Sequence, residues 1–214
     1  MFEVIPGILE KEWAAIEKKI ELVRPFARTI HIDLLDGKFA PNSTFMDPTP
    51  FAQYSQDIFF ELHMMVDNPA QYLQPFANAG FKRFIGQVEK MPDIADFVAQ
   101  GQILGEVGLA LDGKTSVDAI TVPYEDLDFL FVMTVNAGYS GQEFQPEYVE
   151  KVKLLRAKNA YTNLGEPLPI EVDGGINAKT LTIAKDAGAT RAVATSFLFN
   201  APDPHTQFKL LQGF

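Results

Sequence analysis

The sequence predicts an α/β protein, because short apolar segments alternate regularly with longer amphipathic ones. Eight segments rich in β-branched, aliphatic and aromatic residues recur along the chain, and residues 127–135 form a strongly apolar one. Most of these segments are apolar on both faces, which is typical of parallel strands that are covered by helices. Between the first two segments, Trp13, Ile16 and Ile20 recur at helical spacing.

The expected elements can be placed in order along the chain. Strands are expected at residues 4–9, 29–35, 59–66, 83–88, 105–111, 127–135, 169–172 and 191–196. Helices are expected at residues 13–23, 69–79, 94–99, 146–158, 178–187 and 204–211, with a short one near 117–120. Eight β-α units in 214 residues predict a closed (β/α)8 TIM barrel, in one domain over residues 1–214. The alternative, an open doubly wound sheet, usually has a glycine-rich turn after its first strand, and residues 8–11 contain no glycine.

The composition excludes several classes of function. A formal net charge of -10 argues against binding to nucleic acid, because phosphate backbones attract lysine and arginine. The absence of cysteine excludes a disulfide framework, a thiolate nucleophile and a thiolate metal site. No apolar run reaches the length of a membrane span, and no secretion signal precedes the first strand. We therefore expect a cytoplasmic protein with no nucleic-acid or membrane partner.

Two histidines and two aspartates fall near the ends of predicted buried strands. His31 and Asp33 are two residues apart, so they share one face of a strand, and His63 lies in the next strand. Asp173 ends the seventh strand. Each residue alone fits a packed histidine or a helix-capping aspartate, but four such groups at strand ends predict a divalent metal site. Two imidazoles and two carboxylates suit Zn, Fe, Mn or Co, whereas His205 begins a polar terminal helix and is expected at the surface.

Four segments resemble the signature segments of ribulose-phosphate 3-epimerases. They are residues 31–42 (HIDLLDGKFAPN), 62–66 (LHMMV), 132–142 (VMTVNAGYSGQ) and 171–177 (EVDGGIN). They occur in the family's order and at similar spacing, and the resemblance extends over essentially the whole chain. It implies a metal-dependent epimerase that inverts carbon three of a ketose phosphate, interconverting ribulose 5-phosphate and xylulose 5-phosphate or a close analogue.

The resemblance also implies roles for individual residues. The ligands of one divalent metal would be His31, Asp33, His63 and Asp173. Asp33 and Asp173 would be the two acid/base groups, one on each face of a planar enediolate. The residues expected to contact the sugar phosphate are Met65, Met133, Gly138, Ser140, Gly141, Gly174, Gly175, Thr195 and Ser196. Gly138, Ser140 and Gly141 lie in residues 138–142, which would form a loop that closes over the substrate.

The chain departs from the family's pattern around the substrate. Gly7 stands where the family has a serine, Leu35 where it has a methionine, Gln87 where it commonly has a histidine, and Thr195 where it has a glycine. The metal and acid/base residues are kept, so the substrate is less closely defined than the reaction. One alternative is a hexulose phosphate such as allulose 6-phosphate.

Three further possibilities stay open. One is another barrel enzyme that uses a metal-stabilised enediolate, such as an aldose–ketose isomerase or an aldol-type lyase, although no lysine lies inside a predicted strand to form a Schiff base. Another is a sugar-phosphate-binding barrel without activity, although a pure binding protein has no need of two opposed acids. A homo-oligomer is in keeping with the family, and the sequence identifies no surface for it.

Overall fold

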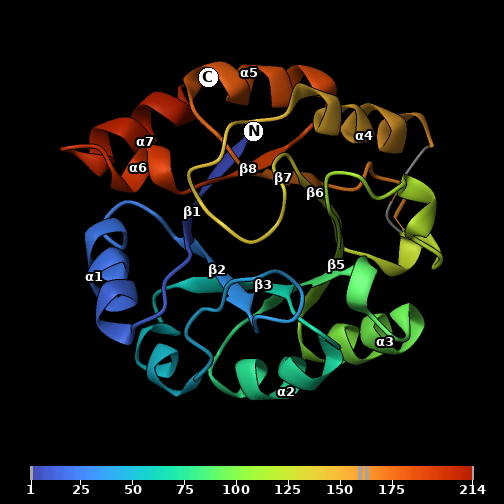
Figure 1. Ribbon diagram of the computed structural model, residues 1–214, viewed down its shortest axis with the longest axis horizontal. Coiled ribbons are helices and arrows are strands. Elements are labelled where there is room, and N and C mark those ends of the chain that lie inside the picture. The colour runs from blue at the N-terminus through green and yellow to red at the C-terminus, as the bar shows by residue number, and fades with distance from the viewer. Residues whose placement is uncertain (1, 159–160, 162–163, 214) are drawn as a thin grey trace.

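The computed structural model describes residues 2–158, 161 and 164–213. Its centre is a closed barrel of eight parallel strands, in which each strand pairs with the next and β8 pairs with β1. Figure 1 shows this ring of strands surrounded by helices. The predicted (β/α)8 barrel is therefore confirmed.

The strands agree with the predicted segments to within a few residues at each end. They are β1 Glu3–Ile8, β2 Thr29–Leu35, β3 Phe59–Met65, β4 Arg83–Gln87, β5 Glu106–Leu111, β6 Phe129–Met133, β7 Ile170–Asp173 and β8 Arg191–Ala194. The carboxyl ends of all eight meet at one mouth of the barrel, because the strands are parallel and adjacent in sequence order.

The outer ring consists of α-helices and of shorter 3-10 helices. The α-helices are α1 Trp13–Val23, α2 Ala70–Asn78, α3 Ile94–Leu104, α4 Pro146–Ala157, α5 Ala178–Ala187, α6 Ser196–Phe199 and α7 Pro204–Gln212. The 3-10 helices are Thr49–Tyr54, Val88–Lys90, Val117–Ala119 and Tyr124–Asp126.

Several helix predictions need correction. Eight β-α units were expected, but after β2 and β5 only 3-10 helices follow the strand, and one of them, Val117–Ala119, is the short helix expected near residues 117–120. Pro48 and Pro50 in the first of these connections, and Pro123 in the second, restrict the backbone and remove donors that an α-helix needs. The helix predicted at residues 94–99 continues to Leu104, and Gly101 in this extension packs closely against Val107 of the barrel. The four residues of α6 are too few to give a periodic pattern.

Alternation along the strands separates two apolar regions. In β2, Ile30, Ile32 and Leu34 belong to the large core between the sheet and the helices. A smaller apolar cluster, which includes Phe131, fills the inside of the barrel. Since successive side chains point to opposite faces, the remaining residues of β2 point into the barrel. The fold thereby directs His31 and Asp33 toward the barrel axis.

Candidate functional site

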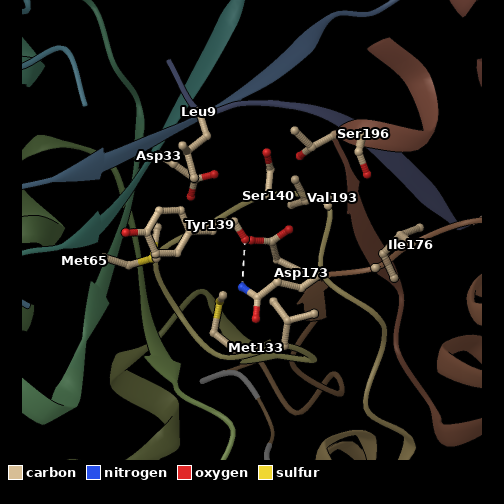
Figure 2. A pocket seen from close by; sticks show the side chains of 17 residues that line it. Leu9, Asp33, Met65, Met133, Tyr139, Ser140, Asp173, Ile176, Val193 and Ser196 are labelled. Carbon is tan, nitrogen blue, oxygen red and sulfur yellow. Dashed lines mark hydrogen bonds between the residues drawn. The ribbon is translucent and has the colours of Figure 1, made fainter. Parts of the chain in front are cut away.

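A pocket opens at the mouth formed by the carboxyl ends of the strands. Its lining residues are Leu9, Asp33, Met65, Met133, Val135, Gly138, Tyr139, Ser140, Gly141, Gln142, Asp173, Gly174, Gly175, Ile176, Val193, Thr195 and Ser196. Figure 2 shows the Asp33 and Asp173 carboxyl groups in this pocket, together with Met65 and Met133. The pocket thus contains both predicted acid/base residues and all nine residues predicted to contact the sugar phosphate.

The four residues predicted as metal ligands come together below this pocket. Each of His31, Asp33, His63 and Asp173 offers one ligand atom, and these atoms all lie within 4.8 Å of one another. Asp33 Oδ1 is 3.2 Å from His31 Nε2 and 2.9 Å from His63 Nδ1. All four side chains are buried. The donor set fits a divalent ion such as zinc, iron, manganese or cobalt, whose ligands are imidazole nitrogens and carboxylate oxygens.

Burial and neighbouring charges act against each other at the two histidines. Burial alone would lower the pKa of His31, but Asp33 and Glu61 beside it raise that pKa well above its ordinary value. For His63, burial outweighs the attraction of Asp33 and lowers the pKa. Burial would raise the pKa of Asp33, whereas His31 and His63 hold it well below its usual range. Asp33 is therefore ionised at neutral pH.

Asp173 behaves differently from Asp33. Its burial and the nearby negative charge of Asp33 raise its pKa to about 7. Two carboxyl groups in one pocket with pKa values far apart can serve as a base and an acid at the same pH. The arrangement is therefore suited to proton transfer at a carbon that lies between them.

Three buried polar residues behind the histidines were not predicted as part of the site. Glu61 contacts His31, and Arg83 in turn contacts Glu61. Gln87 contacts His63. One signal in the sequence was the position of Glu61 two residues before His63, because it gives both side chains the same strand face. A glutamate inside an apolar strand also requires a buried partner.

A second buried glutamate, Glu171, lies beside this group. Its carboxylate oxygens have no hydrogen-bond partner within the described part of the chain, and one of them is 3.8 Å from His31 Nδ1. Burial and the charge of Glu61 raise the pKa of Glu171 well above its ordinary value. Both effects favour the neutral form of Glu171, which would limit the negative charge inside the barrel.

The loop after β6 covers the pocket. Asn42 Nδ2 donates to Gly138 O at 2.8 Å, and the Tyr139 hydroxyl donates to Pro41 O at 2.5 Å. The free volume beneath is only about 30 Å³, room for a water molecule or two but too little for a sugar phosphate.

Two of the departures from the family's pattern turn out to be neighbours. A Cβ atom added to Gly7 would lie 2.5 Å from Thr195 Oγ1 and 2.5 Å from Val193 Cγ1. The side chain of Thr195 therefore occupies the space that Gly7 leaves free. The Thr195 hydroxyl thus lies beside the backbone of Gly7, where the family resemblance leads us to expect a serine side chain.

A (β/α)8 barrel with a buried imidazole–carboxylate cluster and an acid–base pair at the carboxyl ends of its strands defines a barrel enzyme. Comparison with known proteins identifies the kind of enzyme. The chain matches the model of the Ribulose-phosphate 3 epimerase family over residues 3–199. The chain belongs to this family, and it is accordingly an epimerase of carbohydrate metabolism.

Individual relatives agree with this assignment. The chain is 34% identical to the ribulose-phosphate 3-epimerase of Schizosaccharomyces pombe, over 94% of this chain and 89% of that protein. It is also 34% identical to the cytoplasmic isoform of the rice enzyme, with the same shares covered. A solved structure of 3-hexulose-6-phosphate synthase from Salmonella typhimurium superposes with a TM-score of 0.70, covers 99% and 97% of the two chains, and has 11% identity. This last likeness concerns the fold alone. Among the described residues, no helix has both the length and the apolar character to span a bilayer.

Metal affinity is predicted to rise with pH. His31 and Asp173 have raised pKa values, so both hold protons near neutral pH that a divalent ion must displace. Each displaced proton makes the apparent affinity rise about tenfold per pH unit. Competition titrations against a chelator at pH values between about 6 and about 8, the range in which histidine usually titrates, measure this slope. An affinity that does not change with pH would contradict this account of the cluster.

Gly7→Ser is predicted to lower the free energy of unfolding by about 1 to 3 kcal/mol, because the new side chain overlaps Thr195 and Val193. Thr195→Gly in the same protein removes one of the two overlaps and should recover part of that loss. Chemical denaturation of the two single variants and the double variant gives the coupling. Strictly additive effects would show that the two positions are independent.

Proposed function

We propose that the protein is a metal-dependent 3-epimerase of a ketose phosphate and that it interconverts ribulose 5-phosphate and xylulose 5-phosphate. One observation carries this proposal: Asp33 and Asp173 enter the same pocket from β2 and β7, with pKa values displaced in opposite directions. Inversion at a carbon beside a ketone requires a proton to leave on one face and return on the other. Two carboxyl groups on different walls of one pocket meet that requirement.

The residues that would hold the metal are His31, Asp33, His63 and Asp173. A bound divalent ion would supply positive charge that stabilises the negative charge developing on the substrate's oxygens. The chain's own residues carry the proton transfers.

In the forward direction, one aspartate takes the proton from carbon three. The electrons of the broken C–H bond form the carbon–carbon double bond of a planar enediolate, and the ketone oxygen takes up the negative charge. The other aspartate, in its protonated form, then delivers a proton to carbon three from the opposite face, which restores the ketone with inverted configuration. Microscopic reversibility exchanges the two roles in the reverse direction, so either of Asp33 and Asp173 must be able to hold a proton.

Met65 and Met133 are proposed to line the reacting carbons. Both side chains are buried at the carboxyl ends of β3 and β6 and border the pocket. A thioether donates no hydrogen bond and titrates at no ordinary pH. These side chains therefore exclude water from the enediolate without offering a competing proton.

The phosphate group is proposed to bind near the ends of β7 and β8. Gly174 and Gly175 line the pocket and both have positive φ, 119° and 66°, a backbone conformation that favours glycine. Thr195 and Ser196 add hydroxyl groups on the neighbouring side. The net charge of -10 opposes an anionic ligand, so local donors of this kind must supply its affinity.

Gly138, Ser140 and Gly141 are proposed to act through the movement of their loop. In the closed position the loop leaves too little volume for the substrate, and few contacts to residues 41 and 42 hold it there. Closure after binding excludes water and protects the enediolate from side reactions.

The alternative functions require different residues or a different cavity size at the site. A hexulose phosphate such as allulose 6-phosphate would use the same acid–base pair and a longer substrate cavity. A Schiff-base lyase needs a lysine in the pocket; Lys151 is buried and has a pKa lowered to about 8, but it donates to the Asp112 and Gly113 carbonyl oxygens outside the lining. A binding protein without activity leaves the acid–base pair without a purpose.

Two broader expectations accompany the proposal. A cytoplasmic location is in line with the similarity to the cytoplasmic isoform of the rice enzyme. A homo-oligomer is expected from the family resemblance alone.

Solvent deuterium incorporation tests the proposal directly. Protein loaded with Zn²⁺, Mn²⁺, Co²⁺ or Fe²⁺ should catalyse uptake of deuterium at carbon three of ribulose 5-phosphate and formation of the epimer, and treatment with a chelator should abolish both. Mass spectrometry follows the label, and parallel reactions with allulose 6-phosphate rank the two substrates. Metal-loaded protein that labels neither sugar phosphate would rule out the proposed reaction, and faster labelling of allulose 6-phosphate would favour the hexulose alternative.

A further inference from the structure

The two histidines of the metal cluster are held from behind by different partners, through different ring nitrogens. His31 Nδ1 is 2.7 Å from Glu61 Oε1, deep inside the barrel. His63 Nε2 is 3.1 Å from the side-chain amide of Gln87. Because only one nitrogen of a neutral imidazole carries hydrogen, each of these contacts determines which nitrogen is left with a free lone pair.

Glu61 can only accept a hydrogen bond from His31. Its other oxygen, Oε2, accepts from Arg83 Nη1 at 2.6 Å, and both side chains are buried. A guanidinium group is always charged and only donates, so Arg83 keeps Glu61 ionised. Both carboxylate oxygens of Glu61 are then acceptors, one toward Arg83 and one toward His31. When a metal ion displaces the second proton of His31, the hydrogen that remains is therefore on Nδ1, and Nε2 is the nitrogen left free.

Gln87 selects the other tautomer for His63, with the hydrogen on Nε2. With its amide oxygen toward His63, its nitrogen donates to Ala110 O at 3.2 Å and to Glu89 Oε2 at 2.7 Å. The reverse orientation would place the amide oxygen against these two acceptors. Glu89 is itself held in place, since its Oε1 accepts from Asp112 N at 2.8 Å. His63 therefore donates from Nε2 to Gln87, and its Nδ1 is free.

The two free nitrogens are the ones that face the cluster. His31 Nε2 and His63 Nδ1 are the atoms that lie 3.2 Å and 2.9 Å from the same oxygen, Asp33 Oδ1. A divalent ion that displaces the proton from His31 Nε2 would therefore find both of these nitrogens available as ligands. The hydrogen bonds to Glu61 and Gln87 and the contacts with Asp33 are therefore consistent with the same pair of tautomers.

We propose that Glu61 and Gln87 are positioning residues that fix opposite tautomers of His31 and His63, so that a metal ion is bound by Nε2 of the first and Nδ1 of the second. The inference rests on the metal-binding part of the proposed function but not on the identity of the substrate. Arg83 and Glu89 act one step further out, because they orient Glu61 and Gln87.

Glu61→Gln tests the first half of the inference. The glutamine oxygen would face Arg83, which only donates, and the amide nitrogen would then face His31 Nδ1. That contact requires the hydrogen of His31 to move to Nε2, into the metal position. The affinity for Co²⁺ should fall by about 10- to 100-fold, as is usual when the outer partner of a metal-bound histidine is lost.

A second substitution should reverse this loss. In Glu61→Gln with Arg83→Met, no cation dictates which way the amide faces, so its oxygen can again accept from His31 Nδ1. The double variant should therefore bind Co²⁺ more tightly than Glu61→Gln alone. Glu106→Gln is the matched control, because Glu106 bonds to the far side of Arg83, at Nε, and makes no contact with the cluster. Its affinity should stay within about twofold of the wild-type value, as surface substitutions usually have small effects.

Gln87→Leu tests the second half of the inference, since leucine offers no acceptor to His63 Nε2. It should also lower Co²⁺ affinity by about 10- to 100-fold. Nitrogen-15 NMR of the zinc-loaded wild-type protein reports the tautomers directly. His31 should show a protonated Nδ1 and a metal-bound Nε2, and His63 the reverse.

The outcomes separate this inference from the proposed function. Chelator competition and the visible spectrum of the Co²⁺ protein give the affinities, and circular dichroism confirms that each variant is folded. Binding by the predicted nitrogens, together with weaker binding in Glu61→Gln and its recovery in the double variant, supports the inference even if no sugar phosphate turns over. Metal coordination through the same ring nitrogen in both histidines, or a folded Glu61→Gln variant with wild-type affinity, overturns it. If the wild-type protein takes up no Co²⁺, this inference and the metal dependence of the proposed function both fall.

Discussion

The ionised carboxylate of Asp33, buried between two imidazole rings and facing a second carboxyl group, is the constraint on which the site depends. A charge inside the barrel is tolerated only where close partners replace water. His31 and His63 are those partners, and their own positions depend on the residues behind them. Burial together with the charge of Asp33 keeps the pKa of Asp173 near neutrality. One electrostatic arrangement therefore accounts both for a cluster that fits a divalent metal and for an acid–base pair.

The barrel accommodates this site because its interior is not uniformly apolar. Above the level of the histidines, Met65 and Met133 border the pocket, and beside them the ring of Phe131 stacks on His31 with centroids 5.6 Å apart. Below that level, Glu61 and Arg83 form a buried ion pair. The lower ion pair fixes the orientation of the upper cluster, while the apolar residues around it exclude water. The inward-facing residues of a few strands therefore both fill the barrel and form the site.

Much of the fold was predictable, because eight apolar segments with intervening helices leave few topologies open. The clustering of His31, Asp33, His63 and Asp173 was also predictable, since parallel strands in sequence order bring their carboxyl ends together. The roles of Glu61, Arg83 and Gln87 were not, because they depend on strand register, such as the pairing of His31 with Glu61, which periodicity does not determine. The link between Gly7 and Thr195 was missed for the same reason, as it crosses from β1 to the end of β8.

Exchange of the proton on carbon three, measured separately from each epimer in Asp33→Asn and Asp173→Asn, tests the two-acid account most directly. Asparagine keeps an oxygen ligand for the metal but cannot take up a proton. Nuclear magnetic resonance in deuterium oxide would follow ribulose 5-phosphate and xylulose 5-phosphate, with the metal content of each variant measured in parallel. The account predicts that neither variant interconverts the epimers and that each retains exchange from only one of them, a different one in each case. A metal-containing variant that still interconverts the epimers at a near wild-type rate, or two variants that retain exchange from the same epimer, would contradict it.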